Sequence, residues 1–252
     1  MVDPMHFEAS ADDYAAARPP YPAGLWERLR TLGLLRPGAT ALDLGAGTGQ
    51  ATGPLLEAGL RVTAVEPGPR LAALLRAAHP AADVRVCRAE DVELAASAVD
   101  LVVAATSIHW MDLDVLLPKI YTILTPTGRL AVWRNVFGDA DAPTTPFRAR
   151  IAEIIAARRA PPRPGPPAED IDATIEALTA SGLFVEMDAS TYRWTLEFDA
   201  AAIGRLFRTF SDWSAGEVEH AVEAANDLGG TVTEHYSSWL VVLAPIERLS
   251  AP

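Results

Sequence analysis

The sequence has little cysteine and no long apolar run. Its 252 residues include one cysteine, Cys87, which excludes an internal disulfide and fits a reducing compartment. No stretch approaches the roughly 18 apolar residues that a membrane helix needs. The acidic N-terminus lacks the apolar segment of a secretion signal. We therefore expect a cytoplasmic protein with no membrane partner.

Basic charge is also scarce. The chain carries 21 Lys and Arg residues against 33 Asp and Glu residues, a net charge of −12, and Lys119 is its single lysine. Because no basic run could follow a phosphate backbone, nucleic acid is not an expected partner. His6, His79, His220 and His235 lack the spacing of metal ligands, so no metal site is expected.

Short apolar runs alternate with helical patterns through the first half of the chain. Strands are expected in "TALDLG", "RVTAVE", "DVRVCR", "DLVVAAT" and "RLAVWRN". This alternation predicts an α/β fold with a doubly wound, mostly parallel sheet, whose ligand site lies at the carboxyl ends of the strands. A strand or hairpin in "FVEMDASTYRWTLEF" and a terminal strand in "TVTEHYSSWLVVLAP" complete seven strands.

The same patterns predict four parts of the chain. Residues 1–30 form an N-terminal arm or lid, 31–137 the α/β core, 138–182 a helical cap, and 183–252 the C-terminal part of the core. The cap contains "PPRPGPP", which cannot continue a helix. Arm and cap are expected to lie over the carboxyl edge of the sheet.

Three glycines, Gly45, Gly47 and Gly49, follow the first predicted strand directly. Such a cluster suggests that a ligand approaches the backbone closely. A dinucleotide fingerprint needs a further glycine that is absent by either count, and a phosphate-binding loop needs a lysine at its end. Glu66 ends the second strand, where its carboxylate can accept both hydroxyls of a ribose. The ligand therefore need not carry phosphate.

Four stretches, "LDLGAGTGQ", "VEPG", "RAEDVE" and "LTPTGRLAVW", resemble in order the motifs of class I S-adenosylmethionine-dependent methyltransferases. "YAAARPPYP" and "ATSIHWMD" are similar to a small-molecule subgroup of the trans-aconitate methyltransferase kind. The resemblance implies S-adenosyl-L-methionine as cofactor. It places the glycines at the methionine part, Glu66 at the ribose, and Glu90 or Asp91 at the adenine amino group. The full implied cofactor set is Tyr14, Arg18, Asp43, Gly45, Ala46, Gly47, Gly49, Glu66, Pro67, Glu90, Asp91 and Ala105.

His109 is the first candidate for catalysis. It follows the fourth strand, and an imidazole with a pKa near ~6.5 could take a proton from a hydroxyl or amine. Alternatively, "SIHW" is a structural lid segment. Tyr14 and Asp112 are the reserve candidates. A carboxylate or activated-carbon acceptor would need no base.

The expected function is methyl transfer to an O, N or C atom of a small-molecule acceptor by in-line displacement. One alternative is a nicotinamide-dependent oxidoreductase, which the missing glycine disfavours. The other is a catalytically inactive, cofactor-binding regulatory protein. The cap arginines could suit an acidic acceptor, although such residues more often form a solvated face; they are Arg148, Arg150, Arg158 and Arg159. A homodimer is compatible with the sequence.

Overall fold

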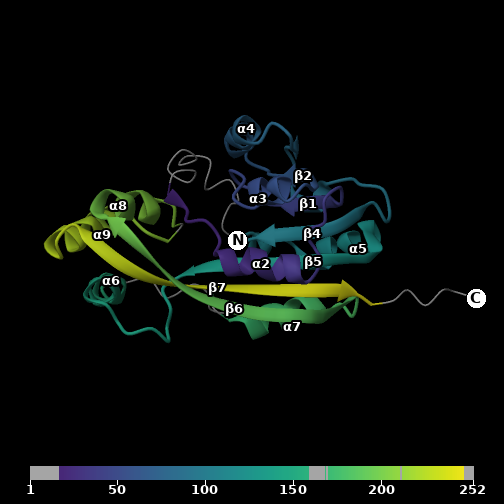
Figure 1. Cartoon of the computed structure of the whole chain (residues 1–252). Helices are drawn as coiled ribbons and strands as arrows, with labels where there is room; N and C mark the ends of the chain where they lie inside the picture. Colours follow the sequence, from purple (N-terminus) through teal and green to yellow (C-terminus); the bar gives the residue numbers. More distant parts are fainter. Residues whose placement is uncertain (1–16, 159–167, 169, 211, 247–252) are drawn as a thin grey trace, which may run out of the picture.

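The computed structural model describes residues 17–158, 168, 170–210 and 212–246. These residues form a seven-stranded sheet with the order β3-β2-β1-β4-β5-β7-β6 (Figure 1). β7 runs antiparallel to β5 and β6, whereas β1 to β5 pair in parallel. The predicted doubly wound, mostly parallel fold is therefore confirmed. The strands are β1 (Thr40–Leu44), β2 (Arg61–Val65), β3 (Asp83–Arg85), β4 (Val99–Ala105), β5 (Leu124–Phe137), β6 (Phe184–Asp199) and β7 (Thr231–Pro245).

Helices flank the sheet on both faces. Those within the core region are α2 (Ala23–Thr31), α3 (Thr52–Glu57), α4 (Pro69–Ala78) and α5 (Leu113–Ile123), and those further along are α6 (Pro146–Ala156), α7 (Ile171–Thr179), α8 (Ala200–Arg208) and α9 (Ala215–Asp227). Two single turns of 3₁₀ helix, η2 (Ala89–Asp91) and η3 (Ile108–Trp110), follow β3 and β4. The N-terminus of α5 is capped by Asp112, whose side chain accepts a hydrogen bond from the Asp114 backbone N–H.

Each face of the sheet packs against its own set of helices, because successive side chains of a strand point to opposite faces. In β4, Leu101 and Val103 pack with α2 and α3, whereas Val102 and Ala104 pack with α5 and α7. These side chains are 0–1% exposed. Burying one side chain of Val or Leu size stabilises the fold by about 1.5–3 kcal/mol. The apolar strand runs thus account for the layered core.

The last three strands extend well beyond the rest of the sheet. β5, β6 and β7 have 14, 16 and 15 residues, whereas β1 to β4 have 3 to 7. Their extension carries α6, α8 and α9, which close a third apolar cluster around Phe147, Phe207 and Tyr236. Figure 1 shows β6 and β7 running out of the sheet toward α8 and α9. We call α6, α8, α9 and the strand ends beside them the distal lobe.

The structure divides the chain differently from the sequence boundaries. The segment 138–182 is not one cap: α6 packs in the distal lobe, whereas α7 buries Leu178 in the core beside the sheet. Within 183–252, α8 and α9 belong to the distal lobe. Within 1–30, α2 buries Leu25 and Leu29 against the sheet and is part of the core. The proline run 161–167 lies outside the described residues.

Candidate functional site

The glycine loop leaves β1 in a left-handed backbone conformation. Gly45, Gly47 and Gly49 have φ angles of +65°, +58° and +100°, which residues with a side chain rarely adopt. A Cβ on Gly45 would lie 2.6 Å from the Cβ of Ser107, and one on Gly49 would lie 2.4 Å from Cδ2 of His79. Protein neighbours therefore already require two of these glycines. The ligand hypothesis has to rest on the side chains around the loop.

Glu66 is bonded directly to that loop. Its Oε2 accepts a hydrogen bond from the Gly47 backbone N–H at 2.9 Å, and its Oε1 accepts one from the Gly68 N–H at 2.8 Å. The residue is 5% exposed. A carboxylate offers about four acceptor positions, so it can hold backbone donors and ribose hydroxyls together. Pro67 follows it, and the Ala46 N–H donates to the Val65 carbonyl at 3.0 Å, which ties the loop to β2.

Asp43 lies in β1 and is fully buried. Its Oδ2 accepts a hydrogen bond from the Thr52 hydroxyl at 2.7 Å. Its Oδ1 has no hydrogen-bond partner among the described residues. Burial raises the pKa of Asp43 to about 7; the Thr52 bond opposes this shift and the Glu66 charge adds to it. A buried acceptor without a donor is costly, so this site favours a ligand or water that donates to Asp43.

The two acids predicted to contact adenine differ in their surroundings. The Glu90 carboxylate accepts hydrogen bonds from the Arg88 guanidinium and, at 2.8 Å, from the Asp112 backbone N–H. Burial raises the pKa of Glu90, but these bonds outweigh it and lower the pKa overall. Asp91 is exposed. Glu90 is therefore fixed as a carboxylate beside the loop after β4; an adenine contact by either residue stays a prediction.

The end of β4 holds a strained residue. Thr106 follows Ala105 with a φ of +59°, and such a conformation in a non-glycine residue costs about 1–3 kcal/mol. Its N–H donates to the Trp133 carbonyl at 2.7 Å, and its hydroxyl oxygen lies 3.2 Å from the Tyr21 hydroxyl and accepts from the Asn135 N–H at 3.4 Å. The surrounding bonds thus hold the strand end in one conformation.

Asn135 ties the N-terminal segment to the carboxyl edge. Its side-chain amide donates to the carbonyl of Pro20 at 3.2 Å and accepts from the Ser238 hydroxyl at 2.7 Å. That hydroxyl in turn accepts from the Trp194 indole N–H at 2.8 Å. Sequence reasoning missed Asn135, Thr106 and Tyr21. An asparagine directly at the end of an apolar strand pattern was the available signal.

His109 lies in η3 and is exposed, with its ring centroid 4.8 Å from that of Trp110. Desolvation by the surrounding protein lowers the pKa of His109, and the positive charges of Arg134 and Arg18 lower it further. The side chain also reaches solvent, and the net shift of its pKa is downward. The imidazole is neutral at physiological pH and is a weaker base than a free histidine. Tyr14 lies outside the described residues.

Arg18 connects the N-terminal segment to the distal lobe. Its guanidinium donates to the Thr209 carbonyl at 2.8 Å and lies 5.1 Å from the ring centroid of Phe210, both near the end of α8. Its charge also acts on His109. Arg18 is therefore placed between the carboxyl edge of the sheet and the distal lobe. Pairing with a cofactor carboxylate stays a prediction.

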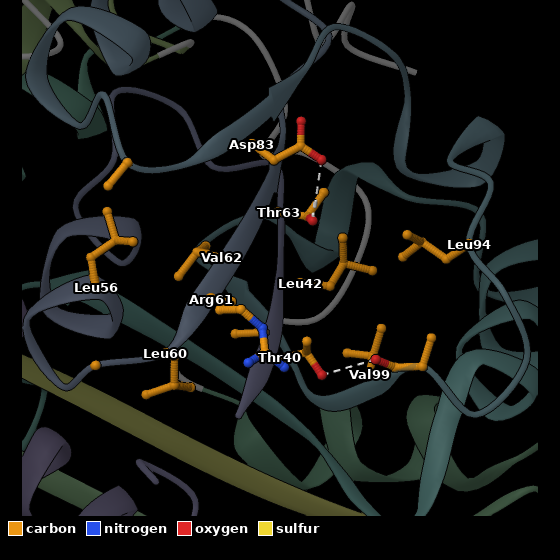
Figure 2. A pocket seen from close by; sticks show the side chains of 14 residues that line it. Thr40, Leu42, Leu56, Leu60, Arg61, Val62, Thr63, Asp83, Leu94 and Val99 are labelled. Atoms are coloured by element: carbon orange, nitrogen blue, oxygen red, sulfur yellow. Dashed lines mark hydrogen bonds between the residues drawn. The ribbon is translucent and has the colours of Figure 1, made fainter. Parts of the chain in front are cut away.

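A pocket of about 600 Å³ lies at the opposite edge of the sheet (Figure 2). Its walls come from the amino ends of β1, β2, β3 and β4, including Thr40, Arg61, Asp83 and Val99. Parallel α/β sheets bind ligands at the carboxyl ends of their strands. This pocket is therefore separate from the glycine loop and from the candidate site.

Two further observations concern the described residues only. Within them, no group of three or more His, Cys, Asp or Glu side chains is arranged to hold a metal ion. No helix in this part of the chain is both long and apolar enough to span a membrane.

The seven-stranded sheet, with helices on both faces, is a Rossmann-like fold. Residues 42–132 match the family described as a methyltransferase domain. An uncharacterized methyltransferase of Mycobacterium tuberculosis is 38% identical over 132 residues, which are 52% of this chain and 53% of that protein. One from Schizosaccharomyces pombe is 27% identical over 214 residues, 84% of this chain and 81% of that protein.

A solved structure also shares the fold. The structure of a candidate type II methyltransferase from Anaeromyxobacter dehalogenans superposes with a TM-score of 0.60 at 25% identity and covers 90% of this chain and 97% of that one. The matches to the first curated relatives span about half of their length. The family match and these relatives therefore support a methyltransferase domain in residues 42–132.

Proposed function

We propose that this chain transfers a methyl group from S-adenosyl-L-methionine to an O, N or C atom of a small-molecule acceptor. The observation that carries the proposal is the buried Glu66 carboxylate, which is hydrogen-bonded to Gly47 and Gly68 at the carboxyl edge of a methyltransferase domain. The cofactor supplies an electrophilic methyl group on a sulfonium.

The residues present fit this cofactor. Glu66 can accept the ribose hydroxyls, and the unpartnered Oδ1 of Asp43 offers a buried acceptor for a donor group or a bridging water. Neither the fingerprint glycine nor a loop lysine is present to hold a pyrophosphate. The adenine contacts of Glu90 or Asp91, and the closing arm with Tyr14 and Arg18, complete the proposed binding site.

Alignment supplies most of the proposed rate enhancement. In-line displacement gains from holding two reactants in line, for which effective molarities of ~10⁵ M or more are available. His109 and Tyr14 are the proposed catalytic residues. The neutral His109 imidazole can accept a hydrogen bond or a proton from an acceptor hydroxyl or amine, but its lowered pKa makes it a weak base. We therefore propose that His109 positions the acceptor more than it drives proton removal.

A calorimetric titration of the full chain with S-adenosylhomocysteine, NAD and NADP tests the proposal. Selective binding of S-adenosylhomocysteine is expected, because the loop lacks pyrophosphate contacts. Selective binding of a nicotinamide dinucleotide would overturn it. Binding of S-adenosylhomocysteine without methyl transfer to any acceptor would favour a regulatory protein. The acceptors tested for methyl transfer should include trans-aconitate, because "YAAARPPYP" and "ATSIHWMD" are similar to the trans-aconitate methyltransferase subgroup. The proposed homodimer is tested by sedimentation in the same buffer.

A further inference from the structure

β7 carries two polar side chains on its apolar face within the distal lobe. Glu234 and Tyr236 share that face with Val232 and are 0% and 2% exposed. Among the described residues, neither carboxylate oxygen of Glu234 nor the hydroxyl oxygen of Tyr236 has a hydrogen-bond partner. Three such oxygens close together are rare in folded proteins, because unpaired buried polar atoms are costly. They indicate a place for hydrogen-bond donors from a ligand.

Arg148 faces the Glu234 carboxylate. The Arg148 Nε from α6 lies 3.7 Å from Glu234 Oε2, which is an ion pair without a hydrogen bond. Its guanidinium stacks on Phe137, 4.8 Å from the ring centroid, and occupies the space left by the missing side chain of Gly138. Burial raises the pKa of Glu234 to about 7, although Arg148 lowers it. Arg148 therefore compensates the burial of this carboxyl group only in part.

Three aromatic rings pack against the ring of Tyr236. The Tyr236 ring centroid lies 5.0 Å from that of Trp194, 5.5 Å from Phe137 and 6.3 Å from Phe198. Such rings favour flat apolar partners. A small molecule recognised here would bury an aromatic or similarly flat body among the rings and direct a polar group toward Glu234.

This cluster adjoins the proposed site of methyl transfer. Phe137 is two residues beyond Asn135 along β5, which is about 7 Å at the usual rise of a strand. Ser238, two residues from Tyr236 along β7, bonds the Asn135 side chain. Arg18 exerts its charge on both His109 and Tyr236. An acceptor held by the cluster could therefore extend toward the carboxyl ends of β4 and β5.

Two other cap arginines, Arg150 and Arg158, pair with acids, whereas Arg159 lies outside the described residues. Arg158 pairs with Asp212 at 3.1 Å and with Glu217 at 2.6 Å, and Arg150 lies within 4 Å of Glu153 and Asp227. Their charges are locally balanced. An acidic acceptor would meet the Glu234 carboxyl group in the lobe interior, which disfavours it.

We infer that Glu234 and Tyr236, with Arg148, recognise the methyl acceptor, and that this acceptor is a flat aromatic small molecule bearing a hydrogen-bond donor, an amine or a hydroxyl. The inference rests on the proposed function. Donation to Glu234 and Tyr236 would satisfy oxygens that have no partner among the described residues. Glu234 and Tyr236 are thus specificity-determining residues of the same reaction.

The variants Glu234→Gln and Tyr236→Phe test this inference in the full chain. Each keeps the shape of the side chain, and neither removes a hydrogen bond seen in the structure, so both are expected to unfold near the parent temperature. The matched control is Glu153→Gln, an exposed acid on α6. Each variant is first titrated with S-adenosylhomocysteine, and equal affinities are expected.

Tyramine, phenethylamine and trans-aconitate are then titrated calorimetrically into the protein saturated with S-adenosylhomocysteine. Tyramine or phenethylamine should bind the parent and the control alike, with at least a ten-fold loss in Glu234→Gln or Tyr236→Phe. Trans-aconitate should bind more weakly than either. Binding of trans-aconitate alone, or of no probe, would overturn the inference. So would unchanged aromatic affinity in both variants, or a steep fall in their unfolding temperature, which would assign Glu234 to stability. Failure to bind S-adenosylhomocysteine in the first step would instead contradict the proposed function.

Discussion

Replacing Glu66 should affect both folding and cofactor binding, and the two effects can be separated. Glu66→Ala removes the acceptor of the buried Gly47 and Gly68 N–H groups. Leaving a buried donor unpaired costs about 1–3 kcal/mol, so the two together cost about 2–6 kcal/mol. This is a large share of the stability of about 5–15 kcal/mol typical of a domain. A loss of ligand binding by this variant alone would therefore be ambiguous.

Glu66→Gln separates the effect on binding from the effect on folding better than Glu66→Ala does. It keeps the shape and one acceptor oxygen, but its amide nitrogen faces one of the two backbone donors, so we expect a stability loss of about 1–3 kcal/mol. The charge-assisted bond to the ribose is worth about 1.5–3 kcal/mol, and its loss should weaken S-adenosylhomocysteine binding ten- to a hundred-fold. Urea unfolding measures the first effect, and calorimetry at a temperature where both proteins are folded measures the second.

A ligand lacking the 2′-hydroxyl gives the decisive control. The parent should bind 2′-deoxy-S-adenosylhomocysteine more weakly than the natural compound, whereas Glu66→Gln should discriminate less between them. The exposed Glu57→Gln serves as the matched variant and should behave as the parent. If Glu66→Gln keeps the parent's discrimination between the two ligands, the ribose role of Glu66 is refuted, whatever happens to its stability.

Three further predictions concern the same edge of the sheet. Because the folded-state pKa of Asp43 is raised from 3.8 to about 7, the native protein binds more protons in that window and loses stability as pH rises through it, by up to about 1.4 kcal/mol per unit. Urea unfolding at pH 5 and pH 8 should show a smaller loss for Asp43→Asn, and equal slopes would contradict the shift. His109→Ala should spare S-adenosylhomocysteine affinity but raise KM for a hydroxyl acceptor by about ten-fold, because it removes one hydrogen bond that positions the acceptor; an unchanged KM would return His109 to a structural role. Asn135→Ala, which loses the bonds to Pro20 and Ser238, should lower the unfolding temperature by several degrees and raise KM for S-adenosylmethionine; an unaltered KM would show that the N-terminal segment does not serve the cofactor.

Local patterns predicted the core of the fold well. Strand period and turn conformation depend on a few adjacent residues. The apolar runs of β1, β2 and β4, and the glycines after β1, could therefore be interpreted from the sequence alone. β6 is one strand, a choice that the sequence left open. Its length matters only through pairing with β7, a contact between distant parts of the chain.

Local sequence patterns could not predict the distal lobe or the polar contacts at the carboxyl edge of the sheet. The bonds of Asn135 join it to residues 115 positions earlier and 103 positions later, and no local pattern reports such contacts. The polar position of Glu234 could have been predicted from the sequence. Glu234 shares one face of an apolar strand with Val232 and Tyr236. An acid at such a position is unusual, and it is a sequence signal for a buried polar site.

The unequal strand lengths explain why two ligands would meet in this chain. β1 and β2 end at the glycine loop and Glu66, whereas β5 and β7 continue into the distal lobe. A ligand at the loop and a ligand held at Tyr236 would therefore lie beside the same stretch of β5, near Asn135. Methyl transfer needs such an approach of two reactants, and rigid strands fix it more firmly than loops would. If the proposed function holds, changes at Glu66 should act on the cofactor and changes at Glu234 on the acceptor, with little coupling between them.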